Sequence, residues 1–307
     1  SSAASDVYKR QPFPGAPTEV VYYESRTDGR LVLVIPWGDK YMIGTTDKKF
    51  DDDPDLAKAD SAEVTYLLSE VNSLIPSANL TEDDILYTYS GVRPLPFVPE
   101  KSEWKVPRSH VIHDHAPECR GLLSIIGGKL TTYRSLAEET VDEVFSQLGR
   151  KAPRCTTHKI LFPGARISDP VAYATQLAEG TTAARESVDR LVAIYGSRAG
   201  DILALGGDEP ALLDVFDPDT GAIGAELVFT FEHEFCRTLT DALIRRVMVG
   251  LNGTCGRDAL ERAADILAAR LGWDQARRNR ETEDSTNYIR RFDVPRQEMA
   301  GADVAAQ

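Results

Sequence analysis

The sequence GLLSIIGGKLTTYRSLAEETVDEVFSQL, residues 121–148, sets the expected fold of the chain. It begins with a short apolar run, Leu122 to Ile126, which has the length and isoleucine content of a fully buried strand and stops at a glycine pair. Beyond the glycines, apolar residues recur at helical spacing as far as Leu148, and acidic residues fall mostly between them. The stretch therefore predicts a strand, a tight turn and a helix.

The turn between this strand and this helix is a candidate ligand site. The first amides of a helix have no partner inside it, and the peptide dipoles add partial positive charge there. Gly127 and Gly128 let a ligand approach the main chain, and Lys129 adds a full charge. The alternative, which spacing alone favours, is that the glycines only make a tight corner. A Walker phosphate loop is excluded, because Leu123 and Leu130 stand where glycine and Ser or Thr are required.

Two arginines are candidate phosphate ligands. Arg93 and Arg108 stand at or beside expected strand ends, with prolines close by. A guanidinium offers a planar fork of N–H donors that matches phosphate oxygens, so two converging arginines would hold a phosphate dianion. The alternative is that each is a surface arginine paired with a carboxylate, which is the ordinary expectation for a chain with a formal charge of −13.

Five motifs, in one order, resemble the FAD-dependent, quinone-linked glycerol-3-phosphate dehydrogenases. They are IPWGDKYMIGTTD (35–47), YSGVRPL (89–95), GGKLTTYR (127–134), YGSRAGDILAL (195–205) and EFCRTLTDALIRR (234–246). A GGK triplet alone would be a weak signal, whereas this combination is specific. The resemblance covers roughly residues 18–292 and only the C-terminal portion of that family.

The resemblance implies oxidation of sn-glycerol 3-phosphate to dihydroxyacetone phosphate, with hydride passing to FAD and electrons passing to a membrane quinone. It implies that Arg93 and Arg108 bind the substrate phosphate. It places Lys129 between the flavin and the substrate, as the catalytic residue. The implied cofactor-binding residues are those of the glycine turn: Gly127, Gly128, Lys129, Leu130 and Thr131. The segment 45–47 (Thr-Thr-Asp) is expected near the site without an assigned role.

Two other functions stay open. One is a different FAD-dependent oxidase of the same superfamily that acts on an amino acid or a hydroxy acid, and the other is a non-catalytic assembly module. A catalytic base is not identified, because none of the five histidines matches a catalytic position in the family. His113, His115 and Cys119 have the residue types of metal ligands, but with no second cluster a polar loop is favoured and no metal site is expected.

The predicted fold class is α+β, as a fragment of an FAD-binding α/β flavoprotein. It comprises an antiparallel substrate-cap sheet and a closing βα unit, followed by an all-α C-terminal domain. The expected segments are a disordered leader (1–17), the substrate-binding cap region (18–115), the closing βα element of the FAD-binding domain (116–150), the C-terminal helical domain (151–295) and a tail (296–307).

Turn and cap residues predict several element boundaries. Thr27-Asp28-Gly29 and Gly38-Asp39 are hairpin signals. Ser61 is a plausible N-cap for a helix, and Asp169-Pro170 begins another with proline at its favoured first position. Further helices are expected to stop at glycines and to place aromatic residues in a core. The glycines are Gly196 and Gly272, and the aromatic residues are Phe229, Phe231 and Phe235.

Composition narrows the partners and the compartment. The charge of −13 argues against a nucleic-acid surface, and no run approaches the length of a membrane-spanning helix. The four cysteines lie far apart and form no CxxC pair, which fits a reducing compartment. We therefore expect a cytoplasmic protein, with peripheral attachment to the cytoplasmic membrane as an alternative, and a homodimer as one expected assembly.

No dinucleotide-binding fingerprint follows a strand in this sequence. Gly250, Gly253 and Gly256 have the wrong spacing for GxGxxG and follow a helical pattern. The sequence thus lacks the Rossmann motif that would hold the ADP half of FAD. We expect a partial sequence that alone neither retains FAD nor turns over.

Overall fold

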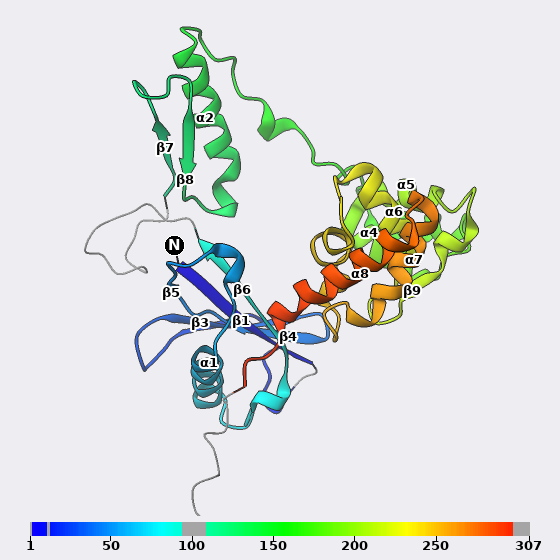
Figure 1. Cartoon of the computed structure of the whole chain (residues 1–307), viewed down its shortest axis with the longest axis horizontal. Coiled ribbons are helices and arrows are strands. Elements are labelled where there is room, and N and C mark those ends of the chain that lie inside the picture. Colours follow the sequence, from blue (N-terminus) through cyan, green and yellow to red (C-terminus); the bar gives the residue numbers. More distant parts are fainter. Residues whose placement is uncertain (1, 11–12, 94–108, 297–307) are drawn as a thin grey trace, which may run out of the picture. The chain divides into compact units, whose positions relative to one another are not determined.

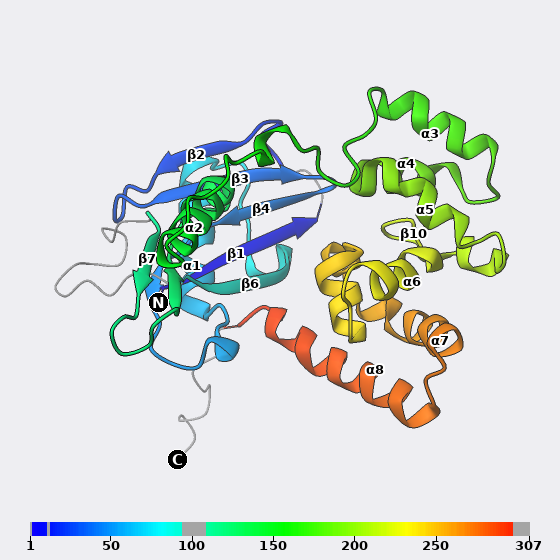
Figure 2. The same cartoon turned by 90° about the horizontal axis from the view of Figure 1, so that it is seen from above.

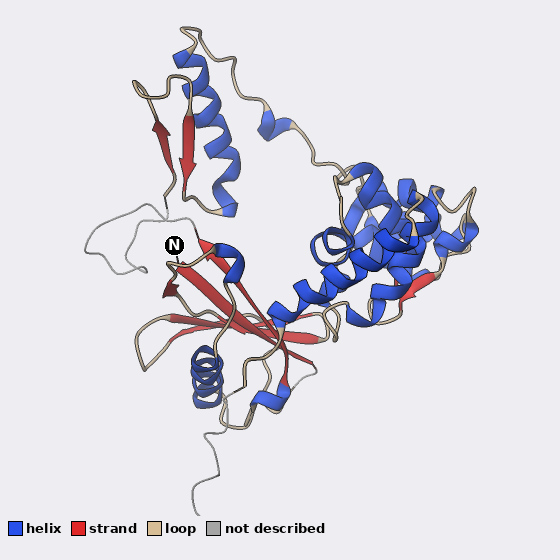
Figure 3. Ribbon diagram, in the orientation of Figure 1, coloured by secondary structure: helices blue, strands red, loops and turns tan. Residues whose placement is uncertain are grey.

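The computed structural model describes residues 2–10, 13–93 and 109–296 (Figure 1). The chain divides into two compact units. The first comprises the residues up to Ile160 together with those from Val294, and the second, the helical unit, is Leu161–Asp293. Strands dominate the first unit and helices the second (Figure 3), so the fold class is α+β, with small antiparallel sheets.

The first unit is built on an antiparallel sheet. The sheet order is β2-β3-β4-β1-β5, and β6 pairs with β1. The expected hairpins are present, with Gly29 and Gly38 at positive φ angles of 72° and 61°. The strands are β1 (Ser2–Arg10), β2 (Val21–Glu24), β3 (Leu31–Trp37), β4 (Lys40–Gly44), β5 (Lys48–Lys49) and β6 (Ile85–Arg93).

The beginning of the chain differs from the expected disordered leader over residues 1–17. Ser2–Arg10 form β1, which pairs with β4, β5 and β6. Further along, Phe13 is buried and its ring lies 5.1 Å from that of Tyr41. Strand pairing uses main-chain groups and depends strongly on the neighbouring strands, so a small, polar composition is weak evidence against a strand.

Helix α1 (Ser61–Leu74) covers one face of this sheet (Figure 1), whose strands lie side by side in Figure 2. Its N-cap is Asp60 and not the expected Ser61, because the Asp60 carboxylate accepts a hydrogen bond from the Glu63 amide at 2.8 Å and the Asp60 amide donates to the Glu63 side chain at 3.1 Å. The core between α1 and the strands is aliphatic, with Val32, Val34, Ile43, Val64, Leu67 and Val71 all buried.

Residues 111–148 form a hairpin followed by a helix, named here the hairpin–helix segment. It comprises β7 (Val111–Asp114), β8 (Leu123–Ile126) and α2 (Tyr133–Gln147), and β7 pairs with β8 antiparallel. The expectation of a fully buried strand is wrong for this structure, since the Ile125 side chain is 49% exposed. One helix beside a two-stranded hairpin leaves much of each strand open to solvent. Helix α2 itself has no buried residue.

The helical unit begins and ends its helices close to the predicted signals. Asp169 caps α3 with Pro170 in the first turn, α4 ends before Gly196, and α7 ends before Gly272. The helices are α3 (Pro170–Glu179), α4 (Arg185–Tyr195), α5 (Ala199–Ala204), α6 (Gly224–His233), α7 (Leu260–Leu271) and α8 (Gln275–Ile289), with a π-helical turn at Asp241–Arg246. The unit is not all-α, because β9 (Val215–Asp217) and β10 (Ala222–Ile223) form a short hairpin.

The prediction that aromatic residues of the helical unit lie in its core is right for one phenylalanine and wrong for another. Phe229 is fully buried, whereas the Phe235 side chain is 83% exposed and its residue has a positive φ of 61°. Phe235 lies beyond the end of α6, so the helical spacing that buries Phe229 no longer applies to it.

Short 3₁₀ turns connect the elements of both units: Pro54–Leu56, Glu82–Asp84, Leu130–Thr132, Thr157–Lys159, Gly196–Arg198, Pro210–Leu213, Val249–Leu251, Arg257–Ala259 and Arg290–Phe292.

Candidate functional site

A pocket of about 370 Å³ opens at the sheet of the first unit. Three parts of the sheet form it: the β2–β3 hairpin, the segment that follows β4, and the end of β6. The lining residues are Asp28, Gly29, Arg30, Leu31, Leu33, Thr45, Asp47 and Arg93. The structure thus places Arg93 in the same pocket as two residues of the 45–47 segment.

Arg93 is held by a carboxylate. Its Nη1 donates to the Asp47 Oδ2 at 2.7 Å, with the Asp47 side chain 11% exposed and the Arg93 side chain 34% exposed. This pairing agrees with the alternative given by the sequence, an arginine that pairs with a carboxylate. A guanidinium has five donors, however, and the described residues of this chain engage one of them. Arg93 is thereby oriented and still has donors for a ligand.

Arg30 is a second arginine in the pocket, and sequence reasoning did not single it out. Its Nε donates to the Asp28 Oδ2 at 2.7 Å, its Nη1 donates to the Asp47 carbonyl at 3.3 Å, and its guanidinium lies 5.0 Å from the ring centre of Tyr66. The only sequence signal was its place directly after the Asp28-Gly29 turn.

The Asp28–Arg30 contact shifts both ionisations toward the charged forms. Burial alone would raise the pKa of Asp28, but hydrogen bonds from Arg30 outweigh it and lower the pKa to about 2. The hydrogen bond to Asp28 likewise raises the pKa of Arg30. The pocket therefore contains two fixed guanidiniums and two carboxylates, and an incoming anion competes with Asp47 for Arg93.

The glycine turn has the geometry that its sequence predicts. Gly127 and Gly128 have φ angles of +75° and +96°, a region that only glycine adopts readily. A Cβ on Gly128 would lie 3.4 Å from the Cβ of His110, so the backbone angle, more than space, requires glycine there. The 3₁₀ turn Leu130–Thr132 follows and leads into α2.

Lys129 sits at the start of this turn with its side chain exposed. The Thr132 hydroxyl donates to the Lys129 carbonyl at 3.0 Å and fixes the turn. Within the described ranges, the Lys129 ammonium makes no ion pair. The turn thus offers a free cation and the first amides of a helical segment, which together suit an electron-rich group.

The remaining candidates lie apart from the pocket or outside the described residues. Arg108 belongs to the range 94–108, which the structure does not describe. His110 contacts Glu139 at 2.8 Å, and the hydrogen bond from His110 lowers the pKa of Glu139. Among the described residues, no group of three His, Cys, Asp or Glu side chains is placed to hold a metal ion.

In the described part of the chain, no helix combines the length and apolar character needed to cross a membrane.

Two family models match the chain in succession. Residues 6–134 match the FAD dependent oxidoreductase family, and residues 155–278 match the C-terminal domain of alpha-glycerophosphate oxidase. The first match covers most of the sheet, the pocket and the glycine turn, and the second covers most of the helical unit. The class of protein is therefore an FAD-dependent oxidoreductase that carries this C-terminal domain.

Individual relatives narrow the class. A glycerol-3-phosphate dehydrogenase of Synechocystis sp. is 39% identical over 92% of this chain and 52% of its own length, and the aerobic glycerol-3-phosphate dehydrogenase of Escherichia coli is 36% identical over 75% of this chain and 46% of its own length. The crystal structure of the glycerol-3-phosphate dehydrogenase from Bacillus halodurans, complexed with FAD, aligns with a TM-score of 0.74 and 25% identity, over 95% of this chain and 57% of that chain.

The resemblance that the motifs predicted, to the FAD-dependent glycerol-3-phosphate dehydrogenases, is confirmed: the two family matches follow each other along the chain, and the relatives named for that activity align with most of it. It spans about half the length of the curated relatives that it matches.

Proposed function

We propose that this chain carries part of the active site of an enzyme that oxidises glycerol 3-phosphate to dihydroxyacetone phosphate, with FAD as the hydride acceptor and quinone as the final electron acceptor. The observation that carries the proposal is the sheet pocket, where Arg30 and Arg93 flank Asp47. The relatives named for this reaction support the choice of substrate.

Arg93 is the proposed ligand of the substrate phosphate in this pocket. Its contact with Asp47 orients the guanidinium before a ligand arrives, which lowers the entropy lost on binding. Arg108 is the second phosphate ligand implied by the family, and Arg30 adds a further guanidinium nearby. A phosphate dianion can accept several charge-assisted hydrogen bonds, so it competes effectively with the single carboxylate of Asp47.

The glycine turn is the proposed flavin contact. The residues present fit the electron-rich edge of a flavin, because the turn combines positive φ angles at both glycines with an exposed lysine that forms no ion pair within the described ranges. FAD, when bound, supplies the acceptor for the hydride that leaves the substrate carbon. The residues that would hold it are Gly127, Gly128, Lys129, Leu130 and Thr131. Lys129 would stabilise negative charge that develops between cofactor and substrate, and such a preorganised donor is typically worth about 10²-fold or more in rate.

The proposed domain roles follow the sequence prediction. The antiparallel sheet with α1 (within 18–115) forms the substrate cap, and the hairpin–helix segment (within 116–150) is the closing βα element of an FAD-binding domain. The helical region (151–295) is the C-terminal domain and offers a surface for a homodimer. A catalytic base stays unassigned, since no histidine of the described residues lines the pocket.

Isothermal titration calorimetry of the purified chain with glycerol 3-phosphate and with glycerol tests the proposal. We expect binding that depends on the phosphate, and an affinity about 10-fold to 100-fold lower in Arg93→Gln, because a charge-assisted hydrogen bond is removed. The matched control is Arg26→Gln, which removes an exposed arginine of the turn between β2 and β3 that does not line the pocket. Equal binding of glycerol, or an unchanged affinity in Arg93→Gln, would contradict the proposal.

The same titration separates the other two functions. Arg93-dependent binding of lactate or alanine, without binding of glycerol 3-phosphate, would favour an oxidase for hydroxy or amino acids, because a carboxylate needs one guanidinium fork. Absence of binding by all of these small molecules would favour the assembly module.

A further inference from the structure

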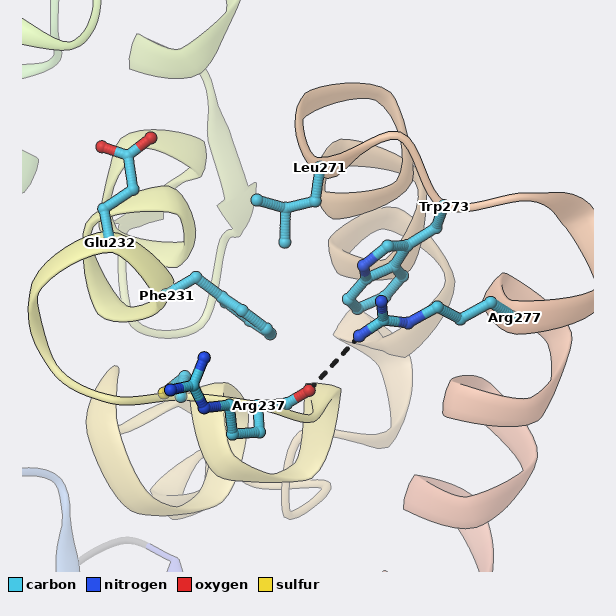
Figure 4. Close-up of a pocket in the computed structure, with 7 residues that line it drawn as sticks. Phe231, Glu232, Arg237, Leu271, Trp273 and Arg277 are labelled. Carbon is cyan, nitrogen blue, oxygen red and sulfur yellow. Dashed lines mark hydrogen bonds between the residues drawn. The ribbon is translucent and has the colours of Figure 1, made fainter.

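The helical unit contains a second pocket, of about 270 Å³, far in sequence from the proposed substrate site. It lies where the end of α6, the end of α7 and the first turn of α8 meet (Figure 4). Phe231, Leu271 and Trp273 turn their side chains toward it from three segments, and Arg237 and Arg277 stand at its edge. The pocket thus combines a wall of apolar side chains with two positively charged arginines.

The apolar wall is aromatic and ordered. Trp273 is 8% exposed, and its ring centre lies 5.8 Å from that of Phe231 at an interplanar angle of 71°. The Arg277 guanidinium lies 4.6 Å from the Trp273 ring centre, and its Nη2 donates to the Arg237 carbonyl at 3.5 Å. These contacts fix the indole and the guanidinium against each other. The wall is therefore formed before any ligand arrives.

The side chains that line this pocket carry two positive charges, on Arg237 and Arg277, and one negative charge. Glu232, the acidic residue of the lining, is bound to Arg270 at 3.2 Å. Arg277 lies 3.6 Å from Glu281. Arg237 makes no side-chain ion pair with any residue that the structure describes, so its charge is available to a ligand.

The floor of the pocket is neutral. Cys236 is 1% exposed, and burial raises the pKa of its thiol, which keeps the sulfur uncharged at neutral pH. A neutral sulfur and an aromatic wall suit a flat, unsaturated group. No buried carboxylate in this lining opposes an anion.

We infer that this pocket binds a small planar organic anion, whose flat body lies against Phe231, Leu271 and Trp273 and whose carboxylate or equivalent group is held by Arg237 and Arg277. An aromatic wall with a few convergent polar groups is typical of small-molecule sites, and the volume admits a ligand of one or two rings. The site is distinct from the sheet pocket and does not depend on the proposed reaction.

Calorimetric titration of the 307-residue chain with benzoate and with 2-naphthoate tests the inference. Benzamide serves as the neutral probe of the same shape as benzoate, and cyclohexanecarboxylate as the non-planar anion. The variant is Arg237→Gln, whose exposed side chain makes no ion pair among the described residues, so folding should be unaffected and is checked by thermal melting. The matched control is Arg280→Gln, an exposed arginine of α8 outside the pocket.

The expected result is saturable binding of benzoate or 2-naphthoate, weakened about tenfold or more by Arg237→Gln and unchanged by Arg280→Gln. Benzamide and cyclohexanecarboxylate should bind at least about tenfold more weakly than benzoate, because each lacks one of the two recognised features. Absence of binding by both planar anions, equal binding of benzamide, or equal loss in the two arginine variants would overturn the inference.

Discussion

The hairpin–helix segment and the helical unit use the same kind of amphipathic sequence with opposite outcomes. In α7, Leu260, Ala263, Ala264 and Leu267 recur at helical spacing, and each is at most 4% exposed. In α2, apolar residues recur at similar spacing, yet the side chains of Tyr133, Val141 and Val144 are 48%, 48% and 42% exposed. The pattern in a helix therefore identifies its apolar face but not whether another element covers it.

The difference in burial between α2 and α7 distinguishes how the two regions are stabilised. Burial of an aliphatic side chain contributes about 1.5–3 kcal/mol, so the helical unit gains most of its stability from faces that cover one another. The hairpin–helix segment gains little in this way, and it carries the glycine turn and Lys129, which makes no ion pair among the described residues. The helical unit is thus the more extensively packed of the two regions, and it has a pocket of its own.

The largest expected contrast is in stability after removal of a leucine side chain. Leu267→Ala in α7 should lower the free energy of unfolding by about 2–5 kcal/mol, because a fully buried side chain leaves a cavity. Leu130→Ala at the glycine turn, where the side chain is 88% exposed, should change it by less than about 0.5 kcal/mol. Urea unfolding followed by circular dichroism measures both, and similar losses in the two variants would erase the contrast.

A smaller effect is expected from the backbone of the glycine turn. Gly128→Ala forces a side chain to a φ of +96°, which should cost about 1–2 kcal/mol, although the added Cβ meets only ordinary contacts. The loss should appear as faster amide exchange in α2 and not in the helical unit. Gly91→Ala in β6, a glycine with no atom within 4 Å of an added Cβ, is the control. Unchanged exchange in α2 would mean that position 128 tolerates a side chain at this backbone angle.

The smallest expected effect concerns pH. The hydrogen bond from His110 lowers the pKa of Glu139 below its unfolded value, so this contact stabilises α2 above about pH 4.3 and is lost as the pH falls through the lower folded value. The helical signal at acid pH should therefore show a small loss in the native chain that Glu139→Gln lacks. Asp142→Asn, an exposed neighbour on the same helix, should retain the loss. Identical acid titrations of all three proteins would argue against the His110 contact.

Local signals allowed much of the fold to be predicted. Asp169-Pro170, Gly196 and Gly272 mark helix ends because caps depend on a few neighbouring residues. Helix α8 (Gln275–Ile289) was not expected, because its composition is mostly polar and only Ser285 and Ile289 are buried. Strand β1 was missed for a related reason, since its place in the sheet rests on main-chain pairing with distant strands.

The candidate site, like the fold, has one part that the sequence predicted and one part that depends on contacts between distant residues. The family motifs pointed to Arg93 and to the glycine turn, because these residue types have a recognisable chemistry. Arg30 carries no such motif, and its role depends on contacts with Asp28 and Asp47 that only the folded sheet creates. The pocket beside Trp273 likewise joins segments from three helices, so no single stretch of sequence indicates it.

Hydrogen exchange of the whole chain, with and without saturating glycerol 3-phosphate, tests most directly the claim that the sheet pocket is the substrate site. We expect slower exchange in the β2–β3 hairpin, in the segment after β4 and at the end of β6 when the ligand is present, with no change in the helical unit. Protection confined to the helical unit, or none in the peptides that contain Arg30, Asp47 and Arg93, would contradict the claim.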